Sequence, residues 1–392
     1  MTVLGWVSAV SLASWVWLAL GRGFFWRTDV RLPERPAPAR WPSVVAVVPA
    51  RDEAEVLPLS LPGLLAQRYP GGARVVLVDD GSSDGTGALA AELGAAGGLP
   101  LAVVSPGEPP AGWTGKLWAL RRGVEEAGDA EYLLLTDADI AHGPDSLARL
   151  VAAAEAGGLD LVSQMARLRV RTGWERLVVP AFVYFFAQLY PFRWSNRPSG
   201  RTAAAAGGCS LVRREALERA GGVAAVRGAV IDDVSLARAV KRSGGRTWLG
   251  LAEHVDSVRP YPGLAQLWRM VSRSAYAQLR YSPLLLAGTV LGLGLVYLVP
   301  PAAAAAGAAG AAAGAGGGPA ALLGLAAWAL MAATYAPMLR YYGQPAAAAV
   351  LLPFTASLYL LMTVDSAVQH RRGRGAAWKG RTYPAPRPGE AG

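Results

Sequence analysis

Two aspartates one residue apart, Asp137 and Asp139, end a short apolar run near the middle of the chain. The run, residues 133–136, is bounded by polar residues, which is typical of a buried strand in a parallel sheet. Ligands of open α/β sheets bind beyond the carboxyl ends of the strands. On an extended segment, residues i and i+2 point the same way, so both carboxylates could reach one hard cation and, through it, a diphosphate. The alternative is an ordinary loop, because D-x-D is a common loop tripeptide.

A second acidic stretch, D-D-G-S-S-D-G-T at residues 79–86, follows another apolar run. Turn-forming residues at the carboxyl end of a strand make a loop whose backbone and carboxylates could contact a nucleotide. The loop is not a phosphate-binding P-loop, because neither G-x-x-x-x-G-K-[ST] nor G-x-G-x-x-G occurs in the sequence. The alternative is an Asp/Gly turn with a helix N-cap at Ser82, Ser83 or Asp84.

The elements that must position these residues alternate along the chain. Apolar runs predict strands at 44–48, 74–78, 101–104 and 132–136, and helical patterns occupy residues 57–65, 87–94 and about 115–127. Strands that alternate with helices at this spacing favour an α/β fold with a doubly wound, mainly parallel sheet. We find no internal repeat in this half of the chain.

Five motifs in order resemble those of the family 2 glycosyltransferases. They are P-A-R-D-E at 49–53, D-D-G-S-S-D-G-T at 79–86, D-A-D at 137–139, G-G-C-S-L-V-R-R-E at 207–215 and I-D-D-V-S-L-A-R-A-V-K-R-S-G at 231–244. The resemblance covers residues 44–280 and implies the Rossmann-like fold called GT-A. G-W-T-G-K-L-W-A-L at 112–120 and P-A-F-V-Y-F-F-A-Q-L-Y-P-F at 180–192 look most like the hopanoid-associated glycosyltransferases of bacteria, and ceramide glucosyltransferases are more distant relatives.

The resemblance implies roles for single residues. Asp137 and Asp139 would hold Mg²⁺ or Mn²⁺, with Asp139 the more direct ligand, and Asp233 would be the carboxylate base that takes a proton from the acceptor hydroxyl. A single base with direct displacement implies inversion at the anomeric carbon. The alternative for Asp232 and Asp233 is a helix N-cap pair. The residues expected beside the nucleotide of the donor are Ala50, Arg51, Glu53 and either Asp79 or Asp80.

Three further positions carry less specific signals. Lys116, in a Gly/Trp-rich loop, could meet a phosphate, or it could be a solvated lysine at a helix start. The family's Q-x-x-R-W motif is altered here: Gln266 and Arg269 are kept, but Met270 stands in place of Trp. We expect Arg273 to take the place of the motif arginine, with Arg269 as the alternative. Cys209 is expected to be a small buried residue, and His254 a packed or surface one.

Composition limits the class of partner. The formal charge is +10, and the basic residues are spread out and flank hydrophobic segments, which favours a membrane surface over nucleic acid. No basic patch interleaved with aromatic residues is visible, so binding of a nucleic acid is disfavoured. A single cysteine excludes an intramolecular disulfide, and the three histidines give no zinc-site spacing.

Several segments are long and apolar enough for a membrane. Residues 3–20 are uncharged and are followed by arginines, so we expect residues 1–22 to be an uncleaved anchor with its N-terminus outside and the following segment in the cytoplasm. A signal peptide is the alternative. Residues 23–43 read as a Pro/Arg-rich linker, and 178–192 as an interfacial helix or a buried core helix. We expect three or four spans within 281–368, depending on the Ala/Gly tract at 302–318, and a basic tail at 369–392.

The sequence therefore predicts a multi-pass protein of the inner (plasma) membrane that moves a sugar from a UDP-sugar to a lipid hydroxyl, with a hopanoid as the expected acceptor. One alternative is a processive polysaccharide synthase of the same superfamily, which the altered Q-x-x-R-W motif disfavours. The other is a membrane scaffold without catalysis, which intact Asp137, Asp139 and Asp233 disfavour.

Overall fold

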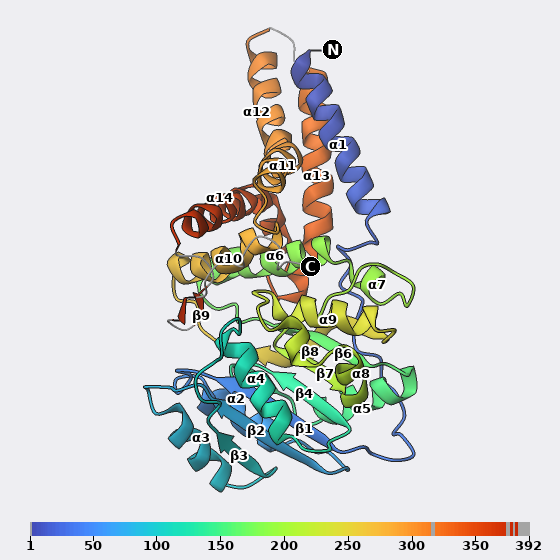
Figure 1. Ribbon diagram of the computed structural model, residues 1–392. Coiled ribbons are helices and arrows are strands. Elements are labelled where there is room, and N and C mark those ends of the chain that lie inside the picture. Colours follow the sequence, from blue (N-terminus) through green and yellow to red (C-terminus); the bar gives the residue numbers. More distant parts are fainter. Residues whose placement is uncertain (1, 315–317, 374–376, 379–380, 383–392) are drawn as a thin grey trace. The chain divides into compact units, whose positions relative to one another are not determined.

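The computed structural model describes residues 2–314, 318–373, 377–378 and 381–382 (Figure 1). Its internal contacts divide the chain into two compact units. The sheet unit comprises Asp29–Arg169, Trp194–Pro260 and Ala376–Gly392, and the helical unit comprises Met1–Thr28, Val170–Arg193 and Tyr261–Gly375. Each unit is described by itself.

The sheet unit is built on one eight-stranded sheet with the order β3-β2-β1-β4-β7-β6-β8-β5. The pairs β1–β2, β2–β3, β1–β4 and β6–β8 are parallel, whereas β4–β7, β6–β7 and β5–β8 are antiparallel. The strands are β1 (Val44–Ala50), β2 (Ala73–Asp79), β3 (Leu101–Val104), β4 (Tyr132–Thr136), β5 (Ile140–His142), β6 (Leu161–Arg167), β7 (Cys209–Arg213) and β8 (Thr247–Ser257). The predicted mainly parallel α/β sheet is confirmed.

Helices cover both faces of this sheet, because its central strands are apolar on both sides. Alternate residues of β1 enter two separate cores: Val44, Ala46 and Val48 one of them, and Val45 and Val47 the other. The first core is closed by α2 (Leu57–Leu65), α3 (Thr86–Ala95) and α5 (Ser146–Gly157). The second is closed by α4 (Gly115–Glu126), α8 (Arg214–Arg219), a 3₁₀ turn (Val223–Val226) and α9 (Asp232–Arg242).

The first four strands and the three helices between them lie within two residues of their predicted bounds. No strand was predicted after residue 136, so β5, β6, β7 and β8 are known only from the structure. β6 reads L-V-S-Q-M-A-R and shows no clear apolar period, although its first six residues are buried. Burial here is imposed by neighbouring strands and helices, which a local pattern does not record.

The helical unit is formed by apolar helices from both ends of the chain and from its middle. Its helices are α1 (Val3–Gly21), α6 (Gly173–Leu189), α10 (Leu264–Gln278), α11 (Pro283–Leu293), a π-helical turn η2 (Gly294–Leu298), α12 (Val299–Ala312), α13 (Gly318–Tyr341), a 3₁₀ segment (Ala346–Leu351) and α14 (Leu352–Arg371). A short helix, α7 (Phe192–Ser195), follows α6. Among the described residues, four helical stretches are long and apolar enough to cross a membrane: Val3–Gly21, Pro283–Ala312, Gly318–Tyr341 and Ala346–Arg371.

The Ala/Gly tract at 302–318 does not form a separate helix among its described residues. Residues up to Ala312 continue the helix that starts at Pro283, and Gly318 begins α13. Residues 315–317 of the tract lie outside the described residues, as does most of the basic tail at 369–392.

α6, which contains residues 178–189 of the predicted interfacial segment, is packed inside the helical unit. The Tyr184 hydroxyl lies 2.8 Å from Thr334 Oγ1 of α13, and Phe185 stacks edge-on against Tyr359 of α14. Tyr297 of η2 donates a hydrogen bond of 2.5 Å to Gln188 Oε1. These contacts agree with the alternative of a buried helix, and an interfacial role of the segment stays a prediction.

Candidate active site

The carboxyl ends of β1, β2 and β4 lie at one edge of the sheet, and they deliver Ala50, Asp79 and Asp137 there. Two helices start at the same place. Thr114 caps α4 by accepting a hydrogen bond of 3.3 Å from the Leu117 N–H, so Lys116 lies in the first turn of that helix. Asp232 and Asp233 form the first turn of α9, where the helix dipole favours negative charge.

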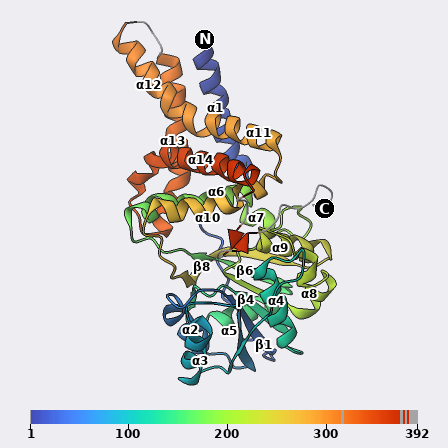
Figure 2. The ribbon, with the colours of Figure 1, turned by 60° about the vertical axis from the view of Figure 1, so that its left-hand side comes forward.

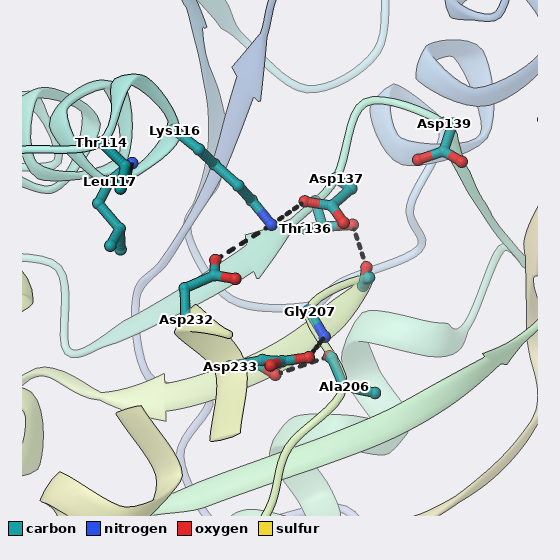
Figure 3. Close-up of polar contacts among 12 residues, drawn as sticks. Thr114, Lys116, Leu117, Thr136, Asp137, Asp139, Ala206, Gly207, Asp232 and Asp233 are labelled. Carbon is teal, nitrogen blue, oxygen red and sulfur yellow. Dashed lines mark hydrogen bonds and ion pairs between the residues drawn. The ribbon is translucent and has the colours of Figure 1, made fainter. Parts of the chain in front are cut away.

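Lys116 joins these elements through two ion pairs (Figure 3). Its Nζ lies 2.9 Å from Asp137 Oδ1 and 3.1 Å from Asp232 Oδ2, so one ammonium group bridges the end of β4 and the start of α9. We name Lys116, Asp137 and Asp232 the lysine cluster. Burial opposes the charge of Lys116, but Asp137 and Asp232 outweigh it and raise its pKa. The amine of Lys116 is therefore charged at neutral pH, and a bound phosphate could contact it.

Asp233 lies beside the lysine cluster. Its Oδ2 accepts a hydrogen bond of 2.9 Å from the Gly207 N–H, and its Oδ1 accepts one of 2.7 Å from the Val234 N–H. No side chain caps α9, so the alternative of an N-cap pair does not describe this carboxylate. Burial raises the pKa of Asp233 to about 6, and Asp232 adds to the increase, while Lys116 and the two N–H donors oppose it. A carboxylate with this pKa can accept a proton near neutral pH.

Gly207 leaves room at the centre of this arrangement. A side chain added there would start 3.4 Å from Lys116 Nζ, 3.6 Å from Asp233 Oδ2 and 3.7 Å from Asp137 Oδ2. The glycine therefore keeps the three charged groups open to a ligand. The motif at 207–215 was recognised from the sequence, but this role of its first residue was not.

A second basic side chain, that of Arg259, pairs with Glu53 and Asp139. Arg259 Nη2 lies 2.7 Å from Glu53 Oε2, and Arg259 Nε lies 3.2 Å from Asp139 Oδ2. Ser257 donates a further hydrogen bond of 2.8 Å to Asp139 Oδ2. We name Arg259, Glu53, Asp139 and Ser257 the arginine cluster. Arg259 was not predicted from the sequence, because its place follows from the antiparallel pairing of β8 with β5 directly after Asp139.

The two aspartates of the D-x-D motif do not point the same way. The segment after Thr136 is a turn, closed by a 3.2 Å hydrogen bond from the Ile140 N–H to the Asp137 carbonyl, and not an extended strand. The assumption of extended geometry was therefore wrong. Figure 3 shows Asp137 directed at Lys116, with Asp139 apart from that pair.

Asp137 is the residue of the lysine cluster that was predicted to hold a divalent cation. Asp137 supplies carboxylate oxygens of the kind that Mg²⁺ and Mn²⁺ prefer, and the Lys116 ammonium already lies beside them as a positive charge. Within the described ranges no three His, Cys, Asp or Glu side chains are gathered to hold a metal ion. A cation bound at Asp137 would therefore have to take most of its ligands from a bound diphosphate.

The loops after β1 and β2 brace each other. Arg51 Nη1 donates a hydrogen bond of 2.6 Å to the Asp80 carbonyl and pairs with the Asp80 carboxylate at 3.5 Å. The Glu53 N–H donates to Thr86 Oγ1 at 2.8 Å, and Asp79 Oδ1 accepts from the Ser82 N–H at 3.0 Å. Asp80 is buried, whereas Asp79 is half-buried. Through these contacts the two loops that carry the residues predicted to border the nucleotide hold each other in place. The role of these residues in nucleotide binding stays a prediction.

A buried polar network lies under the D-x-D turn. His142 Nε2 lies 2.9 Å from Thr136 Oγ1, and His142 Nδ1 lies 3.3 Å from Ser146 Oγ. The Ser146 hydroxyl donates to Gln67 Oε1 at 3.1 Å. Burial lowers the pKa of His142 to about 4, so the ring is neutral at pH 7. The network holds both ends of the turn, and no sequence motif pointed to it.

The remaining candidates are described by their own surroundings. Arg269 and Arg273 belong to α10 in the helical unit, and both are exposed there. Cys209 is buried and His254 is exposed, as expected.

Comparisons with known proteins agree with this geometry. Residues 45–221 match the protein-family model described as Glycosyl transferase family 2. The chain is 38% identical over 117 residues to the polyprenol monophosphomannose synthase of Mycolicibacterium smegmatis, a stretch that covers 29% of this chain and 41% of that relative. It thus matches less than half of the length of that relative.

The fold has a solved counterpart. The structure of the mannosyltransferase PcManGT from Pyrobaculum calidifontis, in complex with GDP-Man and Mn²⁺, resembles this one with a TM-score of 0.58 and 21% sequence identity, over 94% of this chain and 100% of that one. At this identity the likeness concerns the fold.

The class of the protein follows from these findings. Residues 45–221 match the family 2 glycosyltransferase model and the fold is GT-A, and these findings support the prediction of a transferase enzyme. The chain combines this fold with helices that are long and apolar enough to span a membrane.

Proposed function

We propose that this protein is an inverting glycosyltransferase that moves a sugar from a nucleoside diphosphate sugar to the hydroxyl group of a membrane lipid. We propose a UDP-sugar as donor, a hopanoid or related polycyclic lipid as acceptor, and the cytoplasmic side of the inner (plasma) membrane as the place of reaction. The apolar helices of the chain support a membrane-embedded acceptor.

The observation that carries this proposal is the environment of Asp233. A hydroxyl group must lose its proton as it attacks the anomeric carbon, which requires a base within hydrogen-bond reach. Asp233 is oriented by the N–H groups of Gly207 and Val234, and burial raises its pKa to about 6. In the proposed step Asp233 accepts the hydroxyl proton. The new C–O bond forms while the bond to the diphosphate breaks, and the diphosphate leaves with the electron pair.

The lysine cluster supports a donor that carries a diphosphate. Lys116 places a fixed positive charge next to Asp137 and Asp232 at the open edge of the sheet. We propose that this charge contacts the diphosphate and that Asp137 and Asp139 hold Mg²⁺ or Mn²⁺, for which Asp139 must exchange its contact with Arg259. When bound, the cation would offset the negative charge of the leaving diphosphate. Arg51 and Glu53, with Ala50 and Asp79 or Asp80, would border the nucleoside.

A second candidate is mannosyl transfer to a polyprenyl phosphate. It is favoured by the polyprenol monophosphomannose synthase that matches 117 residues of the chain. A phosphate acceptor is already ionised at neutral pH and does not need a base to remove its proton. The need for Asp233 therefore distinguishes the two acceptors.

The experiment is a transfer assay with the purified full chain, Mg²⁺ or Mn²⁺, a panel of UDP-sugars and GDP-mannose, and lipid extracts or polyprenyl phosphate. We expect transfer to a lipid hydroxyl, with a drop of about 10²- to 10⁴-fold in Asp233→Asn. Donor binding should persist in the variant, because Asn keeps an oxygen that can accept the Gly207 N–H bond. NMR of the product should show an inverted anomeric configuration.

The pH profile gives a second test of the base. Since Asp233 must be ionised to accept a proton, kcat/KM should rise with pH up to about 6 and level off above it. Asp233→Asn should lose this rise while its residual rate persists.

Other outcomes would contradict the proposal. Transfer to polyprenyl phosphate that survives in Asp233→Asn would favour the second candidate. A growing polymer would favour a processive synthase, and donor binding without turnover on any acceptor would favour a scaffold.

A further inference from the structure

The four apolar stretches of the helical unit do not run in one direction. α1, α12 and α13 lie side by side, whereas α14 lies across them and packs on α10 and α6, above which both views draw it (Figures 1 and 2). α12 and α13 approach closely at glycines: a side chain added at Gly307 would start 2.4 Å from Ala321 Cβ, and one added at Gly324 would start 2.7 Å from the Pro300 carbonyl. Close contact through small residues is typical of helices that pack within a membrane.

α14 is held by α6 and α10 through its second half. The Tyr359 hydroxyl donates a hydrogen bond of 3.0 Å to the Val178 carbonyl of α6. Asp365 accepts one of 2.9 Å from the Trp268 indole of α10, and Ser366 Oγ accepts one of 3.0 Å from the Tyr276 N–H. His370 stacks on Tyr281 with ring centres 4.3 Å apart. From Tyr359 to its end, α14 is therefore held in turn by α6, α10 and the segment that follows α10.

α10 is a helix of the membrane surface by its chemistry. It buries Leu267 and Val271 on one face, and on the other it exposes Arg269 and Arg273. Guanidinium groups are costly in hydrocarbon, and a helix that is apolar on one face and basic on the other lies along the interface. Because α14 is hydrogen-bonded to α10 at Asp365 and Ser366, we expect the carboxylate of Asp365 to lie near the same interface.

The distribution of charge agrees with three crossings. Residues 281–339 contain no charged side chain, so the connection between α12 and α13 carries none. Arg22 follows α1, and Arg340 lies in the last turn of α13. Three crossings by α1, α12 and α13 put both arginines on one side, together with Arg371 and Arg372 at the end of α14. A fourth crossing by α14 would move the last two to the other side, against the preference of basic residues for the cytoplasm.

We propose that α14 does not cross the bilayer but lies along its cytoplasmic surface with α6 and α10. The chain then crosses the bilayer three times, and both ends of α14 lie on the side that the chain reaches at the end of α1. This proposal does not depend on the reaction catalysed.

The depth of spin labels tests the orientation of α14. Phe354, Leu361 and Val368 are spaced by seven residues on the exposed face of α14, and Val3, Val10 and Trp17 have the same spacing on the exposed face of α1. Each triplet covers about 21 Å of helix. Each residue is replaced by a labelled cysteine in the full chain in lipid vesicles, and accessibility to oxygen is measured by electron paramagnetic resonance. The single natural cysteine, Cys209, is buried, so the wild type is the blank.

We expect one depth for the three α14 labels and three different depths for the α1 labels. If the α14 labels repeat the graded depths of α1, α14 crosses the membrane and the proposal is wrong.

A second measurement tests sidedness. Ala347→Cys and Arg372→Cys flank α14, and Ala313→Cys follows α12. With a maleimide that does not cross membranes, applied to sealed vesicles of each orientation, we expect the first two sites to react from one side and Ala313→Cys from the other. Reaction of Ala347→Cys and Arg372→Cys from opposite sides would overturn the proposal.

Discussion

The lysine cluster and the arginine cluster stand at the same edge of one sheet, yet they hold their carboxylates in different ways. Lys116 contacts Asp137 and Asp232 as a compact charge at 2.9 and 3.1 Å. Arg259 contacts Glu53 at 2.7 Å and Asp139 at 3.2 Å through two different nitrogens, with Ser257 as an additional donor to Asp139. Of the two aspartates of the D-x-D motif, Asp137 thus pairs with a lysine and Asp139 with an arginine.

This difference indicates which aspartate of the D-x-D motif exchanges its basic partner more easily. An ammonium group has no fixed direction, so Lys116 can turn from Asp137 to an incoming phosphate while it stays near Asp232. A guanidinium group in a fixed fork loses two directed bonds when it moves. We therefore expect the lysine cluster to respond first to a bound diphosphate, and Asp139 to become available only after Arg259 has shifted.

Among the variants of the two clusters, Lys116→Met should have the largest effect on kcat/KM. The variant removes the positive charge that separates Asp137 from Asp232 and leaves two half-buried carboxylates facing each other. We expect kcat/KM for the donor to fall about 100-fold, which corresponds to about 2.7 kcal/mol. Steady-state kinetics with the full chain would measure it.

Arg121→Met is the matched control, because it removes a cation of the same helix that pairs with Glu125 at the surface. It should change kcat/KM less than about twofold, since exposed i, i+4 pairs contribute little. If both variants lose activity equally, the effect of Lys116 comes from the helix and not from its charge.

A second prediction concerns what the two clusters share. The turn that carries both aspartates rests on His142, whose pKa burial lowers to about 4 from the ordinary value of 6.5. Below pH 6.5 the unfolded chain binds a proton that the folded chain does not take until about pH 4, so stability is full above pH 6.5 and falls as the pH decreases. Between pH 7 and pH 5 the loss should be about 2 kcal/mol.

Thermal unfolding of the full chain in detergent at pH 7, 6 and 5 would measure this loss against His142→Gln. The variant should be less stable at pH 7 and show a flatter dependence on pH. His254→Gln, on the exposed part of β8, should keep the slope of the wild type. An unchanged slope in His142→Gln would mean that other groups govern the acid side.

The sequence predicted much of this site, because part of it is local. The strand at 132–136, the loop at 79–86 and the first turn of α9 each carry their signal within a few residues, and the order of strands brings their ends together. Asp233 could be singled out for the same reason, since its motif directly precedes a helical pattern.

The rest of the site depends on contacts between distant segments. Arg259 reaches Glu53 across 206 positions of the chain, and it does so only because β8 pairs with β5. The role of His142 under the turn depends on the distant residues that bury it. A histidine on a short strand gives no sign of such burial in the sequence. The two aspartates diverge because a turn replaces the expected extended segment, and this turn is fixed by the buried network below it.

The smallest effect should come from Arg259→Lys. The substitution keeps a positive charge near Glu53 and Asp139 but removes the directed fork, and a lysine cannot donate to both carboxylates with the same geometry. We expect KM for the donor to change less than about tenfold, or about 1.4 kcal/mol, with kcat nearly unchanged. Kinetics at several Mn²⁺ concentrations would show whether the weaker hold on Asp139 lowers the Mn²⁺ requirement. A loss as large as that of Lys116→Met would mean that the arginine cluster takes part in the reaction as directly as the lysine cluster, and the contrast between them would fail.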